Sequence, residues 1–178
     1  YDDAIRFGQK HNELDNYALG MVSVLIGYFY YSLALCSSAL KRQSLSRKQK
    51  KEFQKMVKKI KQWSEWCPVN FKHFYAILSA EQARLRGDHQ LAIQLYHVGI
   101  DLASDQSIID MVAIGNERLA ALYLAMDLEH NAQAHIRNAY DAYYRFGALK
   151  KCEQIAALYP NWITEKSALI LREETVTS

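Results

Sequence analysis

The sequence has few of the residue clusters from which proteins build a metal site. Its six histidines, unaccompanied by any HExxH or CxxC, are His11, His73, His89, His97, His130 and His135. His130 and His135 are five positions apart, which on a helix turns their side chains about 140° from each other. Ligands of one metal ion must converge, so we expect solvent-facing or capping histidines and no bound metal.

The motifs of phosphoryl-transfer enzymes and of common hydrolases are also missing from the sequence. It contains no GxxxxGK[ST], no GxGxxG and no GxSxG. Cys36, Cys67 and Cys152 stand among apolar residues and far from one another, which is typical of buried thiols in a reducing compartment. We therefore predict a cytoplasmic protein that is not an enzyme and needs no cofactor.

The strongest chemical signal is a basic stretch in the first third of the chain. Residues 41–61 contain ten Lys or Arg and one acid, a net charge of +9, whereas the remaining twelve basic and eighteen acidic residues give −6. A basic segment on an otherwise acidic chain disfavours a broad nucleic-acid footprint. It allows opposite patches to associate, so a homo-oligomer is one expected alternative.

Apolar residues inside the basic stretch recur at helical spacing. Phe53, Met56 and Ile60 share one face, and the lysines occupy the other. Ser44 or Ser46 is expected to cap this helix, and Pro68 to stop it after Trp66. The predicted basic patch consists of Lys48, Lys51, Lys55, Lys58 and Lys59.

A solvated outer face is the preferred interpretation of these lysines, and two alternatives remain. One is nucleic-acid binding through residues 41–61, disfavoured because no aromatic residues are interleaved on the lysine face. The other is attachment to an anionic membrane surface by the apolar side of the same helix. That side is better explained as the core side of a helical hairpin, so membrane partners are disfavoured as well.

An uncharged segment, residues 17–40, precedes the basic stretch and is long enough to span a bilayer. Four tyrosines and four serines lower its hydropathy. Its aromatic residues cluster in the middle, from Tyr28 to Tyr31, rather than at the two interfaces of a membrane. We expect a central buried helix in preference to a membrane span.

The chain contains an internal repeat that begins at residue 73. Residues 73–103 align with residues 113–143 at a constant offset of 40. The alignment superposes small residues, Ala80 on Ala120, Ala92 on Ala132, and Gly99 on Ala139. Each unit reads as two helices that cannot bury their apolar faces alone, so neighbouring units are expected to stack.

The pattern predicts an all-α fold of about eight helices, with α-hairpin repeats stacked as a short α-solenoid. We treat residues 1–178 as a single helical-repeat domain cut from a longer protein, because the chain begins with Tyr1 rather than Met. Its expected parts are a long N-terminal hairpin, two repeats and C-terminal capping helices, at residues 17–66, 70–104, 107–146 and 148–173.

Each repeat unit resembles a tetratricopeptide repeat. The first has Ala80, Gly87, Ala92 and Tyr96 at the spacing of that motif, although both units lack its tryptophan and the period exceeds 34 residues. In such hairpins the first helices line a concave groove. The predicted groove residues are Phe74, Ile77, Glu81, Arg84, Ile114, Glu117 and Leu124. An intrahelical ion pair is the alternative for Glu81 and Arg84.

A longer ordered series of segments also resembles a known family. The segments are FYYSLAL at 29–35, WCPVNFKHFY at 66–75, AEQARLRGD at 80–88 and YRFGALKKCEQIAALYP at 144–160. Together they are similar to the helical-repeat segment of large bacterial signalling proteins that fuse a serine/threonine kinase-like domain, a predicted P-loop ATPase and often a sensor histidine kinase. Phe146 stands where a tryptophan is expected, and the basic residues 41–51 depart from the pattern.

The resemblance implies a position between an ATPase and an output module, and it carries over no catalytic residues. The expected function is a non-enzymatic protein-protein interaction or signal-relay scaffold. Its expected partners are a protein or peptide, or neighbouring domains of the same chain.

Overall fold

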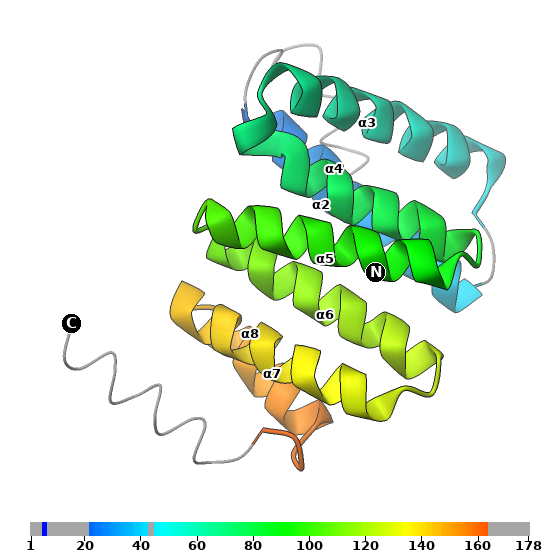
Figure 1. Cartoon of the computed structure of the whole chain (residues 1–178). Helices are drawn as coiled ribbons and strands as arrows, with labels where there is room; N and C mark the ends of the chain where they lie inside the picture. Colours follow the sequence, from blue (N-terminus) through cyan, green and yellow to red (C-terminus); the bar gives the residue numbers. More distant parts are fainter. Residues whose placement is uncertain (1–4, 7–21, 43–44, 164–178) are drawn as a thin grey trace. The chain divides into compact units, whose positions relative to one another are not determined.

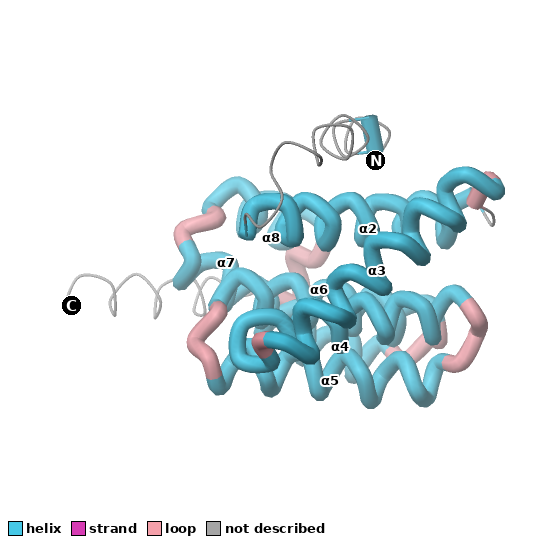
Figure 2. The backbone as a smooth tube through the Cα atoms, turned by 90° about the horizontal axis from the view of Figure 1, so that it is seen from above, coloured by secondary structure: helices cyan, strands magenta, loops and turns pink. Residues whose placement is uncertain are grey.

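A computed structural model describes residues 5–6, 22–42 and 45–163 of the chain. Over these residues the backbone consists of helices joined by short connections, and it has no strand (Figure 2). The helices are α2 Val22–Arg42, α3 Arg47–Trp66, α4 Pro68–Leu85, α5 His89–Asp105, α6 Ile109–Ala125, α7 Glu129–Phe146 and α8 Leu149–Leu158 (Figure 1). The predicted all-α fold is confirmed.

The chain divides into two compact units, residues 1–95 and 96–178, and the division falls inside α5. Unit 1 contains α2, α3, α4 and the first turns of α5, and unit 2 contains the remainder of α5 with α6, α7 and α8. The predicted single domain over residues 1–178 stays a prediction, because compact units that share a helix are no test of it. A division inside a helix leaves no Pro- or Gly-rich linker by which a sequence could reveal it.

In unit 1, helices α2, α3 and α4 pack on one another. Phe29 of α2 meets Phe74 of α4 edge to face, with ring centroids 4.9 Å apart. Other fully buried side chains of this core are Leu25, Leu35, Met56, Ile60, Ile77 and Leu78. Each such side chain contributes about 1.5–3 kcal/mol through removal of its apolar surface from water.

Helix α2 contains most of the uncharged segment 17–40, and one window of it is long and apolar enough to span a membrane. The window Val24–Lys41 passes this test by length and composition, and 72% of the window is buried inside the protein. The part of the predicted hairpin at residues 17–21 lies outside the described residues.

The ends of α3 follow the sequence signals. The Ser46 hydroxyl accepts a hydrogen bond from the Gln49 amide at 3.2 Å, and the Gln49 side chain accepts one from the Ser46 amide at 3.0 Å. This reciprocal arrangement is a capping box. Helix α3 ends at Trp66, and Pro68 occupies the first turn of α4, where its missing N–H costs nothing. Both predictions are confirmed, with Ser46 as the cap.

In unit 2, α6 packs on α7, and α7 packs on α8. The fully or nearly fully buried side chains there are Tyr96, Ala103, Met111, Ala113, Leu119, Ala120, Leu122, Ala132, Ile136, Ala139 and Ile155. Small residues such as Ala120, Ala132 and Ala139 allow helix backbones to approach closely. The repeat alignment singles out the same three positions.

The four connections after α4, α5, α6 and α7 have the same backbone geometry. Each has one residue in the left-handed region, namely Gly87 (φ 79°), Ser107 (φ 55°), Asp127 (φ 58°) and Gly147 (φ 83°). The amide after each of these residues bonds back to a carbonyl five positions earlier, for example Asp88 to Ala83 at 3.0 Å and Ala148 to Tyr143 at 2.9 Å. This is the Schellman motif, and it recurs at 20-residue intervals along the sequence.

The C-terminal prediction holds only in its first part. Helix α8 lies within the predicted span 148–173 and ends before Pro160. Trp162 lies in a turn and Ile163 in a bend rather than in the second capping helix predicted for them, and the Trp162 ring stacks on Tyr159 with centroids 4.7 Å apart. Residues 164–173 lie outside the described part of the chain.

The left-handed turns predict opposite effects for two substitutions. Gly147→Ala should lower the free energy of unfolding by about 1 kcal/mol, because a Cβ is strained at this φ although nothing stands within 4 Å. Asp127→Gly should raise it by less than about 1 kcal/mol. Urea unfolding measures both changes.

Ala134→Gly is the matched control for the stabilisation expected from Asp127→Gly, because Ala134 has an exposed side chain in the interior of α7. A glycine there should cost about 1 kcal/mol. If Asp127→Gly is as destabilising as Ala134→Gly, the left-handed turn does not set the stability of this connection.

Candidate functional site

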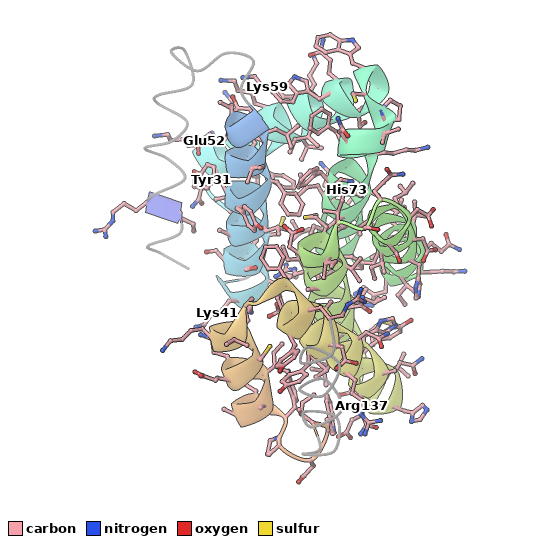
Figure 3. The ribbon with its side chains drawn as sticks, turned by 90° about the vertical axis from the view of Figure 1, so that its left-hand side faces the viewer. Tyr31, Lys41, Glu52, Lys59, His73 and Arg137 are labelled. Atoms are coloured by element: carbon pink, nitrogen blue, oxygen red, sulfur yellow. The ribbon has the colours of Figure 1, made fainter. Side chains whose placement is uncertain are left out.

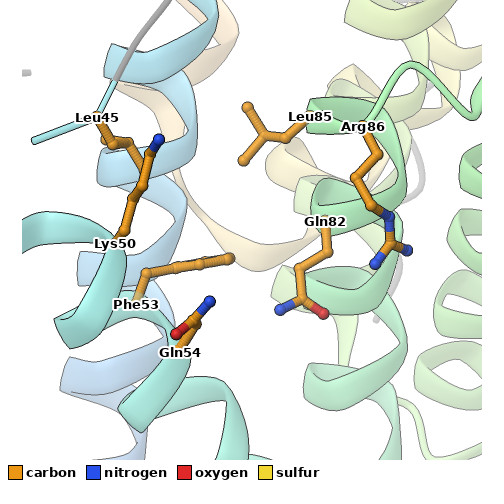
Figure 4. A pocket seen from close by; sticks show the side chains of 7 residues that line it. All are labelled: Leu45, Lys50, Phe53, Gln54, Gln82, Leu85 and Arg86. Carbon is orange, nitrogen blue, oxygen red and sulfur yellow. The ribbon is translucent and has the colours of Figure 1, made fainter. Parts of the chain in front are cut away.

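An open cleft of about 280 Å³ lies in unit 1 between the start of α3 and the end of α4. Its lining residues, shown in Figure 4, are Leu45, Lys50, Phe53, Gln54, Gln82, Leu85 and Arg86. Positions three and four apart on each helix share a face, so α3 and α4 each present one short row of side chains to the cleft.

The chemistry of the cleft combines an apolar surface with cations. Leu45, Phe53 and Leu85 supply the apolar part, and two glutamines supply amide donors and acceptors. Lys50 and Arg86 are both exposed. Such a set can hold a short chain segment that carries an apolar side chain beside a carboxylate, since the cations form charge-assisted hydrogen bonds to carboxylate oxygens.

The predicted groove is wrong for Ile77 and Glu81, whose exposed fraction is 0%, and for Ile114, which is also buried. The prediction treats the first helix of each hairpin as open on one side. In unit 1, α4 packs against both α2 and α3, so less of its surface stays open. Phe74 is half-buried, and its ring lies against the rings of Phe29 and His73.

The remaining groove residues are half-buried and do not line the cleft. They are Arg84, Glu117 and Leu124. Glu117 holds three helices of unit 2 together, because its carboxylate accepts hydrogen bonds at 2.6 Å from Tyr143 of α7 and from Lys151 of α8. The Lys151 ammonium also lies 5.5 Å from the Tyr143 ring centroid. These partners are 26 and 34 positions away, so no local pattern could reveal them.

A second polar cluster of unit 2 surrounds His135. Asn116 donates through Nδ2 to the Val112 carbonyl at 2.9 Å, which leaves its Oδ1 to accept from His135 Nδ1 at 2.8 Å. The His135 ring stacks on Tyr123, and the His97 ring centroid is 5.4 Å away. Burial, and secondarily the neighbouring His97, lower the pKa of His135 below its usual 6.5.

Two histidines therefore differ from the predicted solvent-facing or capping positions. His73 is buried in unit 1, and His135 is half-buried in the cluster just described. Over residues 5–6, 22–42 and 45–163, no group of three or more His, Cys, Asp or Glu side chains is arranged to hold a metal ion.

Four residues of the predicted basic patch are exposed on α3, namely Lys48, Lys51, Lys55 and Lys58. Lys59 differs from the predicted exposed position, because its side chain turns toward α2. There its ammonium donates to the Tyr28 hydroxyl and lies 4.7 Å from the centroid of the Tyr28 ring. Beside it, Tyr31 donates to the Glu52 carboxylate at 2.8 Å (Figure 3). Lys59 and Glu52 thus join α3 to α2.

No protein-family model matches this chain, and neither a curated protein nor a solved structure matches it. The chemistry of the cleft and of the α3 surface therefore has to support any proposal about function.

The His135 cluster predicts a stability that depends on pH. The folded-state pKa lies below the unfolded value, so the unfolded chain binds the proton more readily. The free energy of unfolding should therefore decrease as the pH falls below about 6.5 and level off below the folded pKa. His135→Gln should flatten this part of the profile, as measured by urea unfolding between about pH 7 and pH 5.

His130→Gln serves as the control, because His130 is exposed on the same helix. It should retain the wild-type slope. Equal slopes in wild type and His135→Gln would show that the cluster does not govern the pH dependence.

Proposed function

We propose that the chain is a non-enzymatic protein-interaction or signal-relay scaffold, built from tetratricopeptide-like α-hairpin repeats that stack as a short α-solenoid. The recurrent Schellman turns support the repeats, because hairpins α4–α5 and α6–α7 are closed by the same connection at the same spacing. Helices of 17 or 18 residues separated by short turns are the expected unit of such an array.

The α3–α4 cleft is the observation that carries the binding proposal. It is open, its apolar lining consists of the half-buried Leu45 and Leu85 with the edge of the largely buried Phe53, and its two cations are exposed. An extended or helical segment of a partner can place one apolar side chain on this surface and one carboxylate against Lys50 or Arg86. The proposed ligand is therefore an acidic peptide segment with a neighbouring apolar residue.

The proposed context is a bacterial signalling protein that contains an ATPase or a kinase. It rests on the ordered segments between residues 29 and 160 that resemble such proteins. In that context the acidic segment comes either from a separate protein or from a neighbouring domain of the same chain. Sequencing the complete reading frame tests it: a P-loop upstream or a histidine kinase downstream supports the context, and the absence of both contradicts it.

Peptide selection tests the cleft. From a random display library of short peptides, the chain should enrich sequences in which Asp or Glu stands next to a large apolar residue. Lys50→Glu with Arg86→Glu should weaken a selected peptide about tenfold or more, because each exposed pair contributes up to about 1 kcal/mol and reversal turns attraction into repulsion. Fluorescence anisotropy with the labelled peptide measures the affinity.

The matched control is Lys61→Glu with Lys150→Glu, which changes the net charge equally at two exposed residues that do not line the cleft. It should retain the wild-type affinity within about twofold, since screening limits distant charges. Equal weakening by both double variants would contradict binding in the cleft.

A further inference from the structure

The outer face of α3 carries a row of exposed lysines that ends in an exposed tryptophan. With 100° of rotation per residue, Lys48, Lys51, Lys55, Lys58, Gln62 and Trp66 fall within an arc of about 80°. All six side chains are exposed. Lys48 also forms a long ion pair, with its ammonium 4.0 Å from the Glu52 carboxylate. We call this set the outer row. It points away from the buried residues Phe53, Met56, Val57, Ile60 and Ser64 of the same helix.

The end of the outer row is apolar and protrudes into solvent. Trp66 is 72% exposed, and Val69 in the first turn of α4 is 59% exposed. Pro68 between them is exposed as well. Exposed apolar side chains at Trp66 and Val69 are unfavourable in water, so a partner that covered both would gain free energy from their burial.

Among the described residues, few acids compensate the charges of the outer row. Over the described part of the chain, no acid lies within salt-bridge distance of Lys51, Lys55 or Lys58. Lys51 and Lys55 are four apart, and Lys55 and Lys58 are three apart, so like charges repel along the helix. An anionic partner would relieve this repulsion at each position.

We propose that the outer row, together with Val69, docks on the surface of an anionic lipid bilayer. Lysines favour the negative potential of such a surface, and tryptophan is the residue that most favours its interface. The row extends over about 27 Å along a straight helix, which suits a flat surface of distributed charge. The apolar face of α3 takes no part, since it is buried against α2 and α4.

Two other classes of partner fit these residues less well. An acidic protein would gain little from exposed ion pairs, and the tryptophan lies at the end of the row rather than at the centre, where interface anchors concentrate. A single-stranded nucleic acid would need aromatic residues interleaved with the lysines for base stacking. The proposal is independent of the cleft, which uses Lys50 and Arg86.

Co-sedimentation of the full 178-residue chain with lipid vesicles tests the proposal. Vesicles of phosphatidylcholine with about 30% phosphatidylserine should bind the protein at low salt, and pure phosphatidylcholine should not. Lys51→Gln with Lys55→Gln should lower the partition coefficient about 30-fold, because each lysine near such a surface contributes about a fivefold gain in partitioning. Trp66→Ser should lower it about tenfold.

Tryptophan emission separates insertion from simple charge attraction. Brominated acyl chains should quench wild-type fluorescence, and Trp66→Ser should abolish that quenching although Trp63 and Trp162 remain. Lys61→Gln with Lys150→Gln is the charge-matched control at exposed residues outside the row, and it should change partitioning less than about threefold. These positions are exposed, so circular dichroism should show an unchanged fold for every variant.

Three results would each overturn the proposal. The first is no binding of the wild type to phosphatidylserine vesicles at low salt. The second is equal loss of binding in the row variant and its charge-matched control. The third is binding that survives Trp66→Ser undiminished and is matched by binding to duplex DNA, which would show a nonspecific polyanion site.

Discussion

Burial of the apolar face of α3 fixes the surfaces on which the proposals for unit 1 rest. Phe53, Met56, Val57 and Ile60 together contribute up to about 6–12 kcal/mol by leaving water. Repulsion between lysines three or four apart costs only about 0.2–0.5 kcal/mol per pair. Packing therefore decides the orientation of this helix, and the lysines must accept whatever positions the core leaves to them.

The connections between α4 and α8 impose a second constraint that is independent of residue type. A helix of fixed length must end so that the next helix can pack back, and the Schellman turn achieves this with one left-handed residue. Glycine fills that position at 87 and 147, whereas Ser107 and Asp127 fill it at an energetic cost. Since the geometry is kept where the residue disfavours it, helix packing rather than local preference sets these turns.

Local signals were sufficient to predict much of the fold. The Ser46 cap, the stop at Pro68 and the periodic apolar face of α3 all act within one or two helical turns, and each agrees with the structure. The predictions that failed depend on contacts between residues distant in sequence. Ile77 and Glu81 are buried where the predicted groove needed open surface, and Lys59 turns toward Tyr28, which lies 31 positions earlier. Periodicity identifies a buried face but not which second helix covers the remaining ones.

The failure at Lys59 shows how the angular position of a cation on α3 determines its role. Lys55 points away from the core, and Lys50, rotated by about 140° from it, lines the cleft. Lys59 lies only about 40° from Lys55 on the other side, yet that is enough for α2 to engage it through Tyr28. Glu52 lies on the same side of α3 as Lys59, and its carboxylate accepts a hydrogen bond from Tyr31 of α2. The ten basic residues between positions 41 and 61 are therefore not one patch. Those of α3 divide into residues that line the cleft, contact α2 or face solvent, so a ligand in the cleft and a surface beneath the outer row can be bound by different residues of one helix.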